Sequence, residues 1–287
     1  MGNSVNTNAG ALTALSSLRV NNTALSVTSR QVQTGYRVAD ANDDAAIFSV
    51  AQGVRGNVKA YAQVQSSLSA GIGLGEVTMS ALKGIDNLTG DIKAKIIALS
   101  DGSLTSAQQN VYRGDIHALI SQVNNYISQA TYNGKNLLTG DARATPLSFV
   151  ADVSGTTLSY STIHQLNWDS DEALGPNVLF PTPNDVTDTI NANPPNTTTA
   201  MASLNQFIGR VVEMSSTVAS QMRSMQQQRD FVDNLADAMK KGLGALVDAD
   251  VAAQSATLQS QQVAQQLNMQ ALSIANQQPN VLLSLLR

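Results

Sequence analysis

The chain contains no cysteine. It therefore has neither disulfide bonds nor thiolate metal sites, and its fold must depend on packing and hydrogen bonding. Aromatic residues are also scarce, at 4% of the sequence, and charged residues make up 13%. The charged share is about half of the roughly 25% that is usual for a soluble domain. We expect a core built from leucine, isoleucine, valine, alanine and methionine.

Other absences bear on function. The net charge is −4, and lysine and arginine do not cluster anywhere, which argues against a nucleic-acid-binding surface. The purely apolar runs are far shorter than the ~18 residues of a transmembrane helix, so no membrane insertion is expected. The first residues lack the basic stretch and the continuous apolar stretch of a Sec signal peptide.

Both ends of the chain carry little charge. Residues 251–286 contain no charged side chain and residues 1–18 contain none either, although side-chain amides occur in both segments. A soluble surface helix normally keeps a charged face toward water. We therefore expect both ends to be buried in a partly polar protein environment, formed by other copies of the same chain.

Apolar residues recur at alternating steps of three and four over residues 47–99, 112–130 and 201–246. Heptad repeats of this length predict helices that wind around one another. The ends carry a weaker version of the pattern, in which apolar residues seven apart are interrupted by amides. Either end helix alone would be marginal in water, so we expect the two to pair. The apolar positions of the two ends are the candidate assembly residues: Leu12, Leu15, Leu18, Leu25, Val32, Val251, Leu258, Leu267, Leu272, Leu282 and Leu285.

The middle of the chain has a different character. Residues 147–163 alternate around Ser154-Gly155, which predicts a β-hairpin, and the proline-rich, polar residues 165–199 predict an exposed loop that tolerates deletion. The predicted fold is mainly α, a long coiled-coil-like helical bundle from both chain halves, with a small β-hairpin and loop region in the middle. Three domains are predicted. A discontinuous inner terminal-helix domain comprises residues 1–44 and 248–287, and a discontinuous helical core domain comprises residues 45–146 and 200–247. The hairpin with its variable surface loop comprises residues 147–199.

Residues 40–44 superficially resemble a calcium-binding loop. The EF-hand pattern fails, because Ala45 and Ala51 stand where it needs Gly and Glu. We interpret the segment as the start of a helix, capped by Asn42 or Asp43.

Two further patterns also lack the residues that chemistry would need. His117 and His164 are the only histidines, and they form no HExxH pair. Gly71, Gly73 and Gly75 lie inside a helical pattern, so we interpret them as allowing close packing rather than nucleotide binding. No catalytic, cofactor-binding or metal-binding residue is assigned, no cofactor is expected, and the chain is predicted not to be an enzyme.

Several spaced motifs resemble one protein family. NTNAGALTALSSL at 6–18, TGYRVADANDDAAIFSVAQGVR at 34–55 and YNGKNLL at 132–138 resemble the N-terminal half of bacterial flagellins. VDADVA at 247–252 and ANQQPNVLLSLLR at 275–287 resemble the C-terminal end. The resemblance misses only the middle, where many flagellins insert whole β-domains. The chain is thus similar to a short flagellin with a minimal variable region.

The resemblance implies a structural subunit that polymerises into the extracellular flagellar filament used for swimming motility. It implies as partners further copies of the chain, other flagellins in a mixed filament, an export chaperone, and hook-associated junction and cap proteins. Export would run through the flagellar channel. One alternative is a hook–filament junction protein, against which the motif at 275–287 argues. The other is a secreted effector on a coiled-coil scaffold, for which residues 140–200 offer no catalytic constellation.

The resemblance also marks a region of altered recognition. Flagellins that the vertebrate innate flagellin receptor detects carry QRVRELAV where this chain has IKAKIIAL, starting at Ile92. Lys93 and Lys95 then replace arginines, and Ile96 replaces a glutamate. Because lysine lacks the planar fork of arginine, we expect weak recognition.

A sequon in the predicted loop is a candidate glycosylation site. Its residues are Asn196, Thr197, Thr198 and Thr199.

Overall fold

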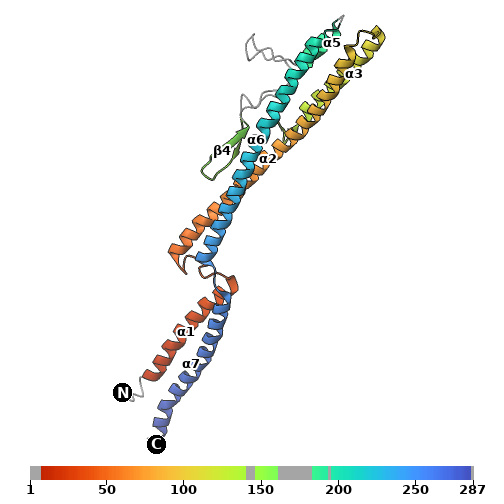
Figure 1. Cartoon of the computed structure of the whole chain (residues 1–287). Helices are drawn as coiled ribbons and strands as arrows, with labels where there is room; N and C mark the ends of the chain where they lie inside the picture. The colour runs from red at the N-terminus through yellow and green to blue at the C-terminus, as the bar shows by residue number, and fades with distance from the viewer. Residues whose placement is uncertain (1–7, 140–145, 161–182, 193–194, 286–287) are drawn as a thin grey trace. The chain divides into compact units, whose positions relative to one another are not determined.

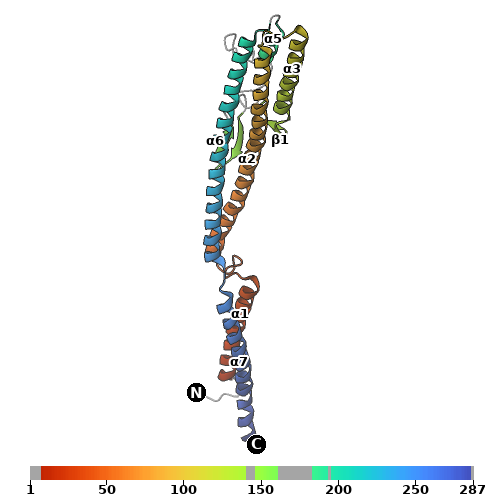
Figure 2. The ribbon, with the colours of Figure 1, turned by 45° about the vertical axis from the view of Figure 1, so that its right-hand side comes forward.

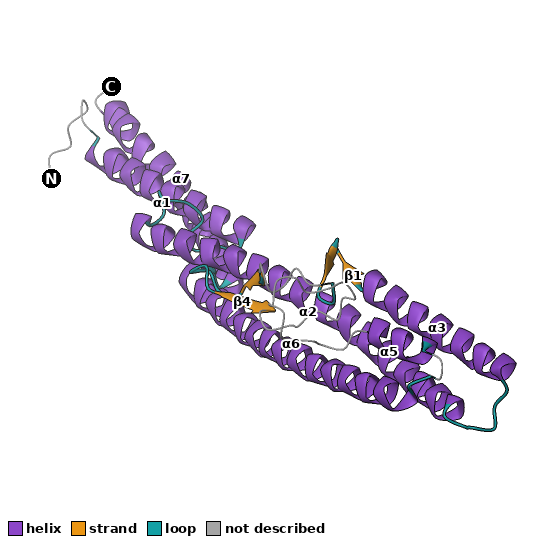
Figure 3. Ribbon diagram, turned by 90° about the horizontal axis from the view of Figure 1, so that it is seen from above, coloured by secondary structure: helices purple, strands orange, loops and turns teal. Residues whose placement is uncertain are grey.

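The computed structural model describes residues 8–139, 146–160, 183–192 and 195–285. Helix dominates these residues, as Figure 3 shows, and the predicted mainly α fold is confirmed. The helices are α1 (Ala9–Thr34), α2 (Ala45–Leu99), α3 (Ser106–Gln129), α5 (Pro183–Asn191), α6 (Thr197–Val247) and α7 (Val251–Leu285). The strands are β1 (Thr131–Tyr132), β2 (Lys135–Asn136), β3 (Leu147–Val150) and β4 (Thr157–Tyr160). Over the described residues, no helix is both long and apolar enough to cross a membrane.

The chain divides into two compact units. We call residues 1–58 with 237–287 the terminal unit, and residues 59–236 the central unit. The division falls inside α2 and α6, whereas the boundaries predicted from sequence, at 44 and 248, coincide with breaks between helices.

The heptad pattern builds the central unit. There α2 and α6 lie side by side and antiparallel (Figure 1), with Lys93 Nζ donating to Asn205 Oδ1 at 3.3 Å and Gln65 donating to Asp233. On α6, buried side chains recur every seven residues as the repeat predicts: Leu204, Val211, Val218, Met225 and Val232.

The predicted stripe on α6 is too narrow. Steps of three and four that start at Met201 predict Ile208 and Ser215 in the core, and both are half-buried. Phe207 and Met214, which these steps skip, are buried. The stripe widens because α6 meets a further helix, and Phe207 lies in the same apolar cluster as Val186 of α5.

The predicted hairpin is confirmed and packs on two helices. Strands β3 and β4 pair antiparallel, with Leu147 opposite Tyr160, and Gly155 in their turn has a φ of 88°. The N–H of Val150 donates to Ser67 Oγ on α2 at 2.9 Å. Gln228 Nε2 on α6 donates to the carbonyl of Ala151 at 2.8 Å. The hairpin therefore ties α2 to α6.

Glycines on α2 make room for this hairpin. Tyr160 donates its hydroxyl to the carbonyl of Gly71 at 2.9 Å. A Cβ at Gly75 would lie 2.4 Å from Tyr160 Oη and 2.4 Å from Met222 Cγ. Burial, together with the negative charge of Glu76, raises the pKa of Tyr160 to about 12. The close contacts at Gly75 are therefore made by the side chains of Tyr160 and Met222, and not by the backbone of another helix.

Residues 183–192 correct the prediction of a loop. Residues 183–191 form α5, with Val186 1% exposed and Ile190 0% exposed. Polar contacts hold its C-terminal end to α3: His117 Nε2 lies 3.1 Å from Asn191 Oδ1, and Arg113 Nη2 donates to the carbonyl of Ala192 at 3.1 Å. The remaining residues of the predicted loop up to 182 lie outside the described residues.

A second hairpin went unnoticed in the sequence. Strands β1 and β2 pair around Asn133-Gly134, whose φ angles are 49° and 73°. An Asn-Gly pair at positive φ is the usual turn of a two-residue hairpin, so the signal was present in the sequence.

We predict opposite effects of the same substitution at two glycines of α2. Gly75→Ala should destabilise the subunit by about 1–3 kcal/mol, because the new methyl group meets Tyr160 and Met222. Gly90→Ala should stabilise it by up to ~1 kcal/mol, because nothing lies within 4 Å of the added atom and alanine favours helix. Urea unfolding of the two monomeric variants measures both; equal shifts would contradict the packing described.

We predict that α5 contributes to stability. Ile190→Ala should cost about 2–5 kcal/mol, because it leaves a cavity in the core. The matched control is Asp188→Ala, on the exposed side of the same helix, which should change stability by less than ~0.5 kcal/mol. If both variants unfold at the same urea concentration as the parent, residues 183–192 are a dispensable loop after all.

Candidate assembly surface

The terminal unit contains an antiparallel pair of helices, α1 and α7 (Figure 2). Side-chain amides cross between them along their length. Asn8 Nδ2 donates to the carbonyl of Ala275 at 2.6 Å, and Asn21 Nδ2 donates to that of Gln261 at 2.9 Å. Gln265 Nε2 donates to Asn22 Oδ1 at 2.8 Å. Such directional bonds fix how far one helix slides along the other.

The seam between the two helices holds some of the predicted assembly residues. We define the seam as the half-buried positions that recur at heptad spacing on α1 and α7 and so face the partner helix. Thr28 is fully buried among them. The predicted residues in the seam are Leu15, Leu18, Leu25, Val32, Leu258 and Leu272.

The other described assembly residues point away from the seam. Leu12, Val251 and Leu267 are exposed. Val20 and Ile274, which sequence analysis did not single out, are 69% and 64% exposed. The side chains of Leu282 and Leu285, at the end of α7, lie outside the described residues.

These exposed side chains have few charges around them. Residues 251–285 carry none, and α1 carries Arg19 and Arg30. Arg30 forms an ion pair with Asp43 and a longer one with Asp40 at 3.6 Å, so its charge is partnered within the subunit. Several large apolar side chains exposed on helices with so little charge are typical of an interaction site.

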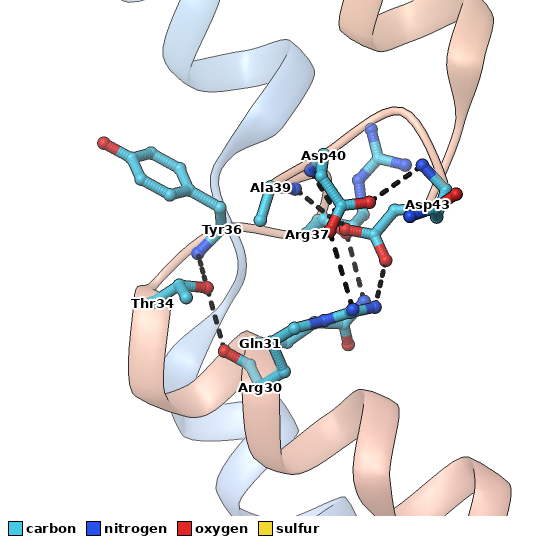
Figure 4. A network of polar contacts seen from close by, with 9 residues as sticks. Arg30, Gln31, Thr34, Tyr36, Arg37, Ala39, Asp40 and Asp43 are labelled. Carbon is cyan, nitrogen blue, oxygen red and sulfur yellow. Dashed lines mark hydrogen bonds and ion pairs between the residues drawn. The ribbon is translucent and has the colours of Figure 1, made fainter.

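A short linker joins α1 to α2 and holds the terminal pair at its base (Figure 4). Gly35 ends α1 with a φ of 71°, a conformation that glycine adopts without strain. The N–H of Arg37 then donates to the carbonyl of Val247 at 2.7 Å, and the N–H of Ala249 donates to that of Gly35 at 2.9 Å. The segment that follows α1 is thus hydrogen-bonded to the segment where α6 ends and α7 begins.

An apolar cluster lies beside this linker in the terminal unit. Val38, Ala51 and Val247 are buried in it, and further apolar side chains pack around them: Ile47, Phe48, Leu243 and Leu246.

The acidic run at 40–44 does start a helix, but the predicted cap was wrong. Asp44 Oδ1 accepts from the N–H groups of Ala46 and Ile47, each at 3.0 Å, so Asp44 caps α2. Asp43 instead accepts from the N–H of Ala39 at 3.0 Å and pairs with Arg30. The two carboxylates therefore have separate structural roles. Among the described residues, no group of His, Asp and Glu could hold a metal ion.

The region compared with the receptor motif does not form one exposed face. Ile96 is 0% exposed and Ile92 is buried as well, so Ile96 does not stand at a surface position where a glutamate could act as acceptor. The expectation that Ile96 replaces a surface glutamate of the receptor-binding region is therefore corrected. Lys93 donates to Asn205 of α6.

The side chain of Lys95 contacts α3 instead of α6. Its Nζ lies 2.5 Å from Asp115 Oδ2 and 5.7 Å from the centre of the Tyr112 ring. The hydrogen bond to Asp115 raises the pKa of Lys95.

The candidate glycosylation residues lie at a helix start. Asn196 is exposed, and its Oδ1 accepts from the N–H of Thr199 at 3.1 Å, so Asn196 caps α6. Thr197 and Thr198 belong to the first turn of α6, rather than to the loop predicted from sequence.

Comparisons with known proteins agree at both ends of the chain. Residues 5–143 match the model of the bacterial flagellin N-terminal helical region, and residues 198–286 match that of the C-terminal helical region. Flagellin FljK of Caulobacter vibrioides is 33% identical over 294 residues, which cover 99% of this chain and 99% of that protein. A flagellin of Brucella melitensis is 33% identical over 292 residues, also covering 99% of each chain.

The crystal structure of Bacillus cereus flagellin is 15% identical to this chain, with a TM-score of 0.46, and the match covers 61% of this chain and 94% of that one. Because both terminal family models and full-length relatives match the sequence, this chain belongs to the bacterial flagellin family.

Proposed function

We propose that this flagellin assembles through the outer faces of α1 and α7, whereas the seam holds the two helices of one subunit together. As a member of its family, the chain is a structural subunit of the extracellular flagellar filament. The observation that supports the proposal is the exposed apolar surface of two nearly uncharged helices. We define the outer face of α1 by Leu12, Val20 and Val27, and that of α7 by Val263, Leu267 and Ile274.

The energetics favour burial of these faces. Each large aliphatic side chain that passes from water into a protein contact contributes roughly 1.5–3 kcal/mol. Association must first offset an estimated 4–15 kcal/mol of lost translational and rotational freedom. A few side chains on each face, repeated with every subunit, are enough to approach that cost. The α7 face carries no charged side chain, whereas on α1 the exposed Arg19, one heptad after Leu12, has to stay solvated or find a partner.

The inner position of these helices follows from the same argument. We infer that residues 1–44 and 248–287 form the inner layer of the filament, that the helical core domain, 45–146 with 200–247, surrounds it, and that the middle of the chain faces outward. No catalytic role is assigned to any residue.

The same apolar faces have to be protected before assembly. We propose that a flagellar export chaperone covers α7 inside the cell, that the chain leaves through the flagellar channel, and that junction and cap proteins contact it at the two ends of the filament. Val263 and Ile274, exposed in the isolated subunit, are the kind of surface that such a chaperone would cover.

We predict that polar substitutions on the outer face of α7 abolish polymerisation without unfolding the subunit. The test variant carries Val263→Gln, Leu267→Gln and Ile274→Gln together. Its monomer should unfold within ~0.5 kcal/mol of the parent, because these side chains are exposed. Electron microscopy should find no filaments, because the apolar contribution to assembly is lost. The control is Val153→Gln, an exposed valine in the turn of the β3–β4 hairpin, which should assemble normally. Normal filaments from the triple variant would refute the proposed surface.

We also propose weak detection by the vertebrate flagellin receptor. Lys93 and Lys95 already have partners within the subunit, and neither offers a bidentate guanidinium. The loss of two charge-assisted contacts lowers affinity by about one hundred-fold or more.

A reporter-cell assay with monomer should therefore show potency at least about one hundred-fold below that of a strongly detected flagellin. The variant with Lys93→Arg and Lys95→Arg should recover part of it. Nanomolar activation by the unmodified chain would contradict this proposal.

A further inference from the structure

The two outer faces of the terminal pair differ in shape. The outer face of α1 carries an open hollow of about 470 Å³, lined by small and β-branched side chains: Val20, Thr23, Ala24, Val27 and Thr28. The outer face of α7 carries longer aliphatic side chains. Val263, Leu267 and Ile274 are spaced four and seven residues apart, so they form one ridge along the helix.

The ridge and the exposed part of the hollow face away from the seam, whereas Thr28, at the edge of the hollow, is buried at the seam. Val20 and Val27 each follow a seam leucine, Leu18 or Leu25, by two positions, which is about 200° around a helix with 3.6 residues per turn. On α7, Ile274 follows the seam residue Leu272 by two positions in the same way.

Within one subunit, the exposed part of the hollow, at Val20 and Val27, therefore does not face the ridge. The ridge of one subunit cannot reach the hollow of the same subunit.

We propose that the ridge of α7 in one copy fits the hollow of α1 in the next copy. This inference rests on the proposed assembly surface and specifies its pairing. Both faces are apolar, the hollow is lined by short side chains and the ridge by longer ones, and neither holds a charged group among the residues that form it. A second copy of this chain supplies both complementary shapes without any other protein.

The pairing has a consequence for the form of the assembly. A contact between two different patches is heterologous, so it leaves one free ridge and one free hollow on every dimer. Each added copy occupies one free ridge or hollow and exposes a new one. Such a contact produces a ring or an open helical polymer, whereas a contact of ridge with ridge would stop at a dimer.

Disulfide cross-linking tests the pairing directly. The chain has no native cysteine, so introduced thiols are the only ones present. The double variant Thr23→Cys with Leu267→Cys is polymerised under reducing conditions and then oxidised in the filament. We expect a ladder of covalent oligomers on a non-reducing gel, because a disulfide needs Cβ atoms about 4 Å apart and this pairing brings the two positions together.

Three controls make the result specific. Thr23→Cys alone and Leu267→Cys alone should give no cross-links, because a heterologous contact does not bring a position against itself. Thr23→Cys with Met269→Cys should give at least about tenfold less product, because Met269 is also exposed but lies about 160° away from Leu267 around α7. Equal ladders from this control, cross-links in either single variant, or normal filaments without cross-links from the test variant would overturn the pairing.

A second test introduces a pair of opposite charges, and it can be used even if the cysteine variants do not polymerise. Val20→Lys or Leu267→Glu alone should lower filament yield by more than about tenfold, since each places an unpaired charge in an apolar contact. The double variant should recover most of the yield at low salt, because each charge then meets its opposite on the next copy. A double variant no better than either single one refutes the pairing. The proposed surface itself fails separately, through normal filaments from the glutamine triple variant.

Discussion

The exposed apolar faces of α1 and α7 are the constraint on which the rest of the structure depends. In the isolated subunit, side chains such as Val20 and Ile274 face water on helices that carry almost no charge to keep them soluble. Within one copy, the antiparallel pair can bury only the seam. We propose that the surface that remains drives association into the filament. The two helices are held in place for it by the hydrogen bonds between residues 35–38 and 247–249.

The choice of amides for the seam suits a chain that must form this pair correctly and then be surrounded by protein. A purely apolar seam would allow the helices to slide by one heptad, whereas the bond between the side chains of Gln265 and Asn22 is lost by such a slip. Amides also cost less to bury than charges, provided that they are hydrogen-bonded. Asp43 of the linker pairs with Arg30 at the end of α1, and the backbone N–H groups of Ala39 and Asp40 also donate to its carboxylate.

Much of this could be predicted from the sequence, because the determinants are periodic. The heptad repeats located α2, α3 and α6, and the lack of charge indicated assembly at both ends. Helix α5 was missed because its helical signal amounts to two buried side chains, Val186 and Ile190, within a proline-rich segment. The cap at Asp44 could not be distinguished from its neighbours, since three carboxylates and an amide stand within five residues and only side-chain geometry separates them.

The burial of Ile96 and the outer faces of α1 and α7 could also be predicted from the sequence. Ile92, Ile96 and Leu99 follow steps of four and three within the apolar repeat over residues 47–99, so the interpretation of Ile96 as a receptor-facing position conflicted with the repeat itself. The outer faces were also readable in outline, because Val20 and Ile274 each follow a heptad position by two residues. The hollow on α1 and its match to the α7 ridge required the structure.

Side-chain solvent accessibility, compared between monomer and filament, tests the central claim most directly. Hydroxyl-radical footprinting read by mass spectrometry reports it for individual aliphatic residues. The account predicts that Val20, Leu267 and Ile274 are labelled in the monomer and protected in the filament, whereas the seam residues Leu258 and Leu272 change little. Outer-face residues that stay as strongly labelled in the filament as in the monomer would contradict it.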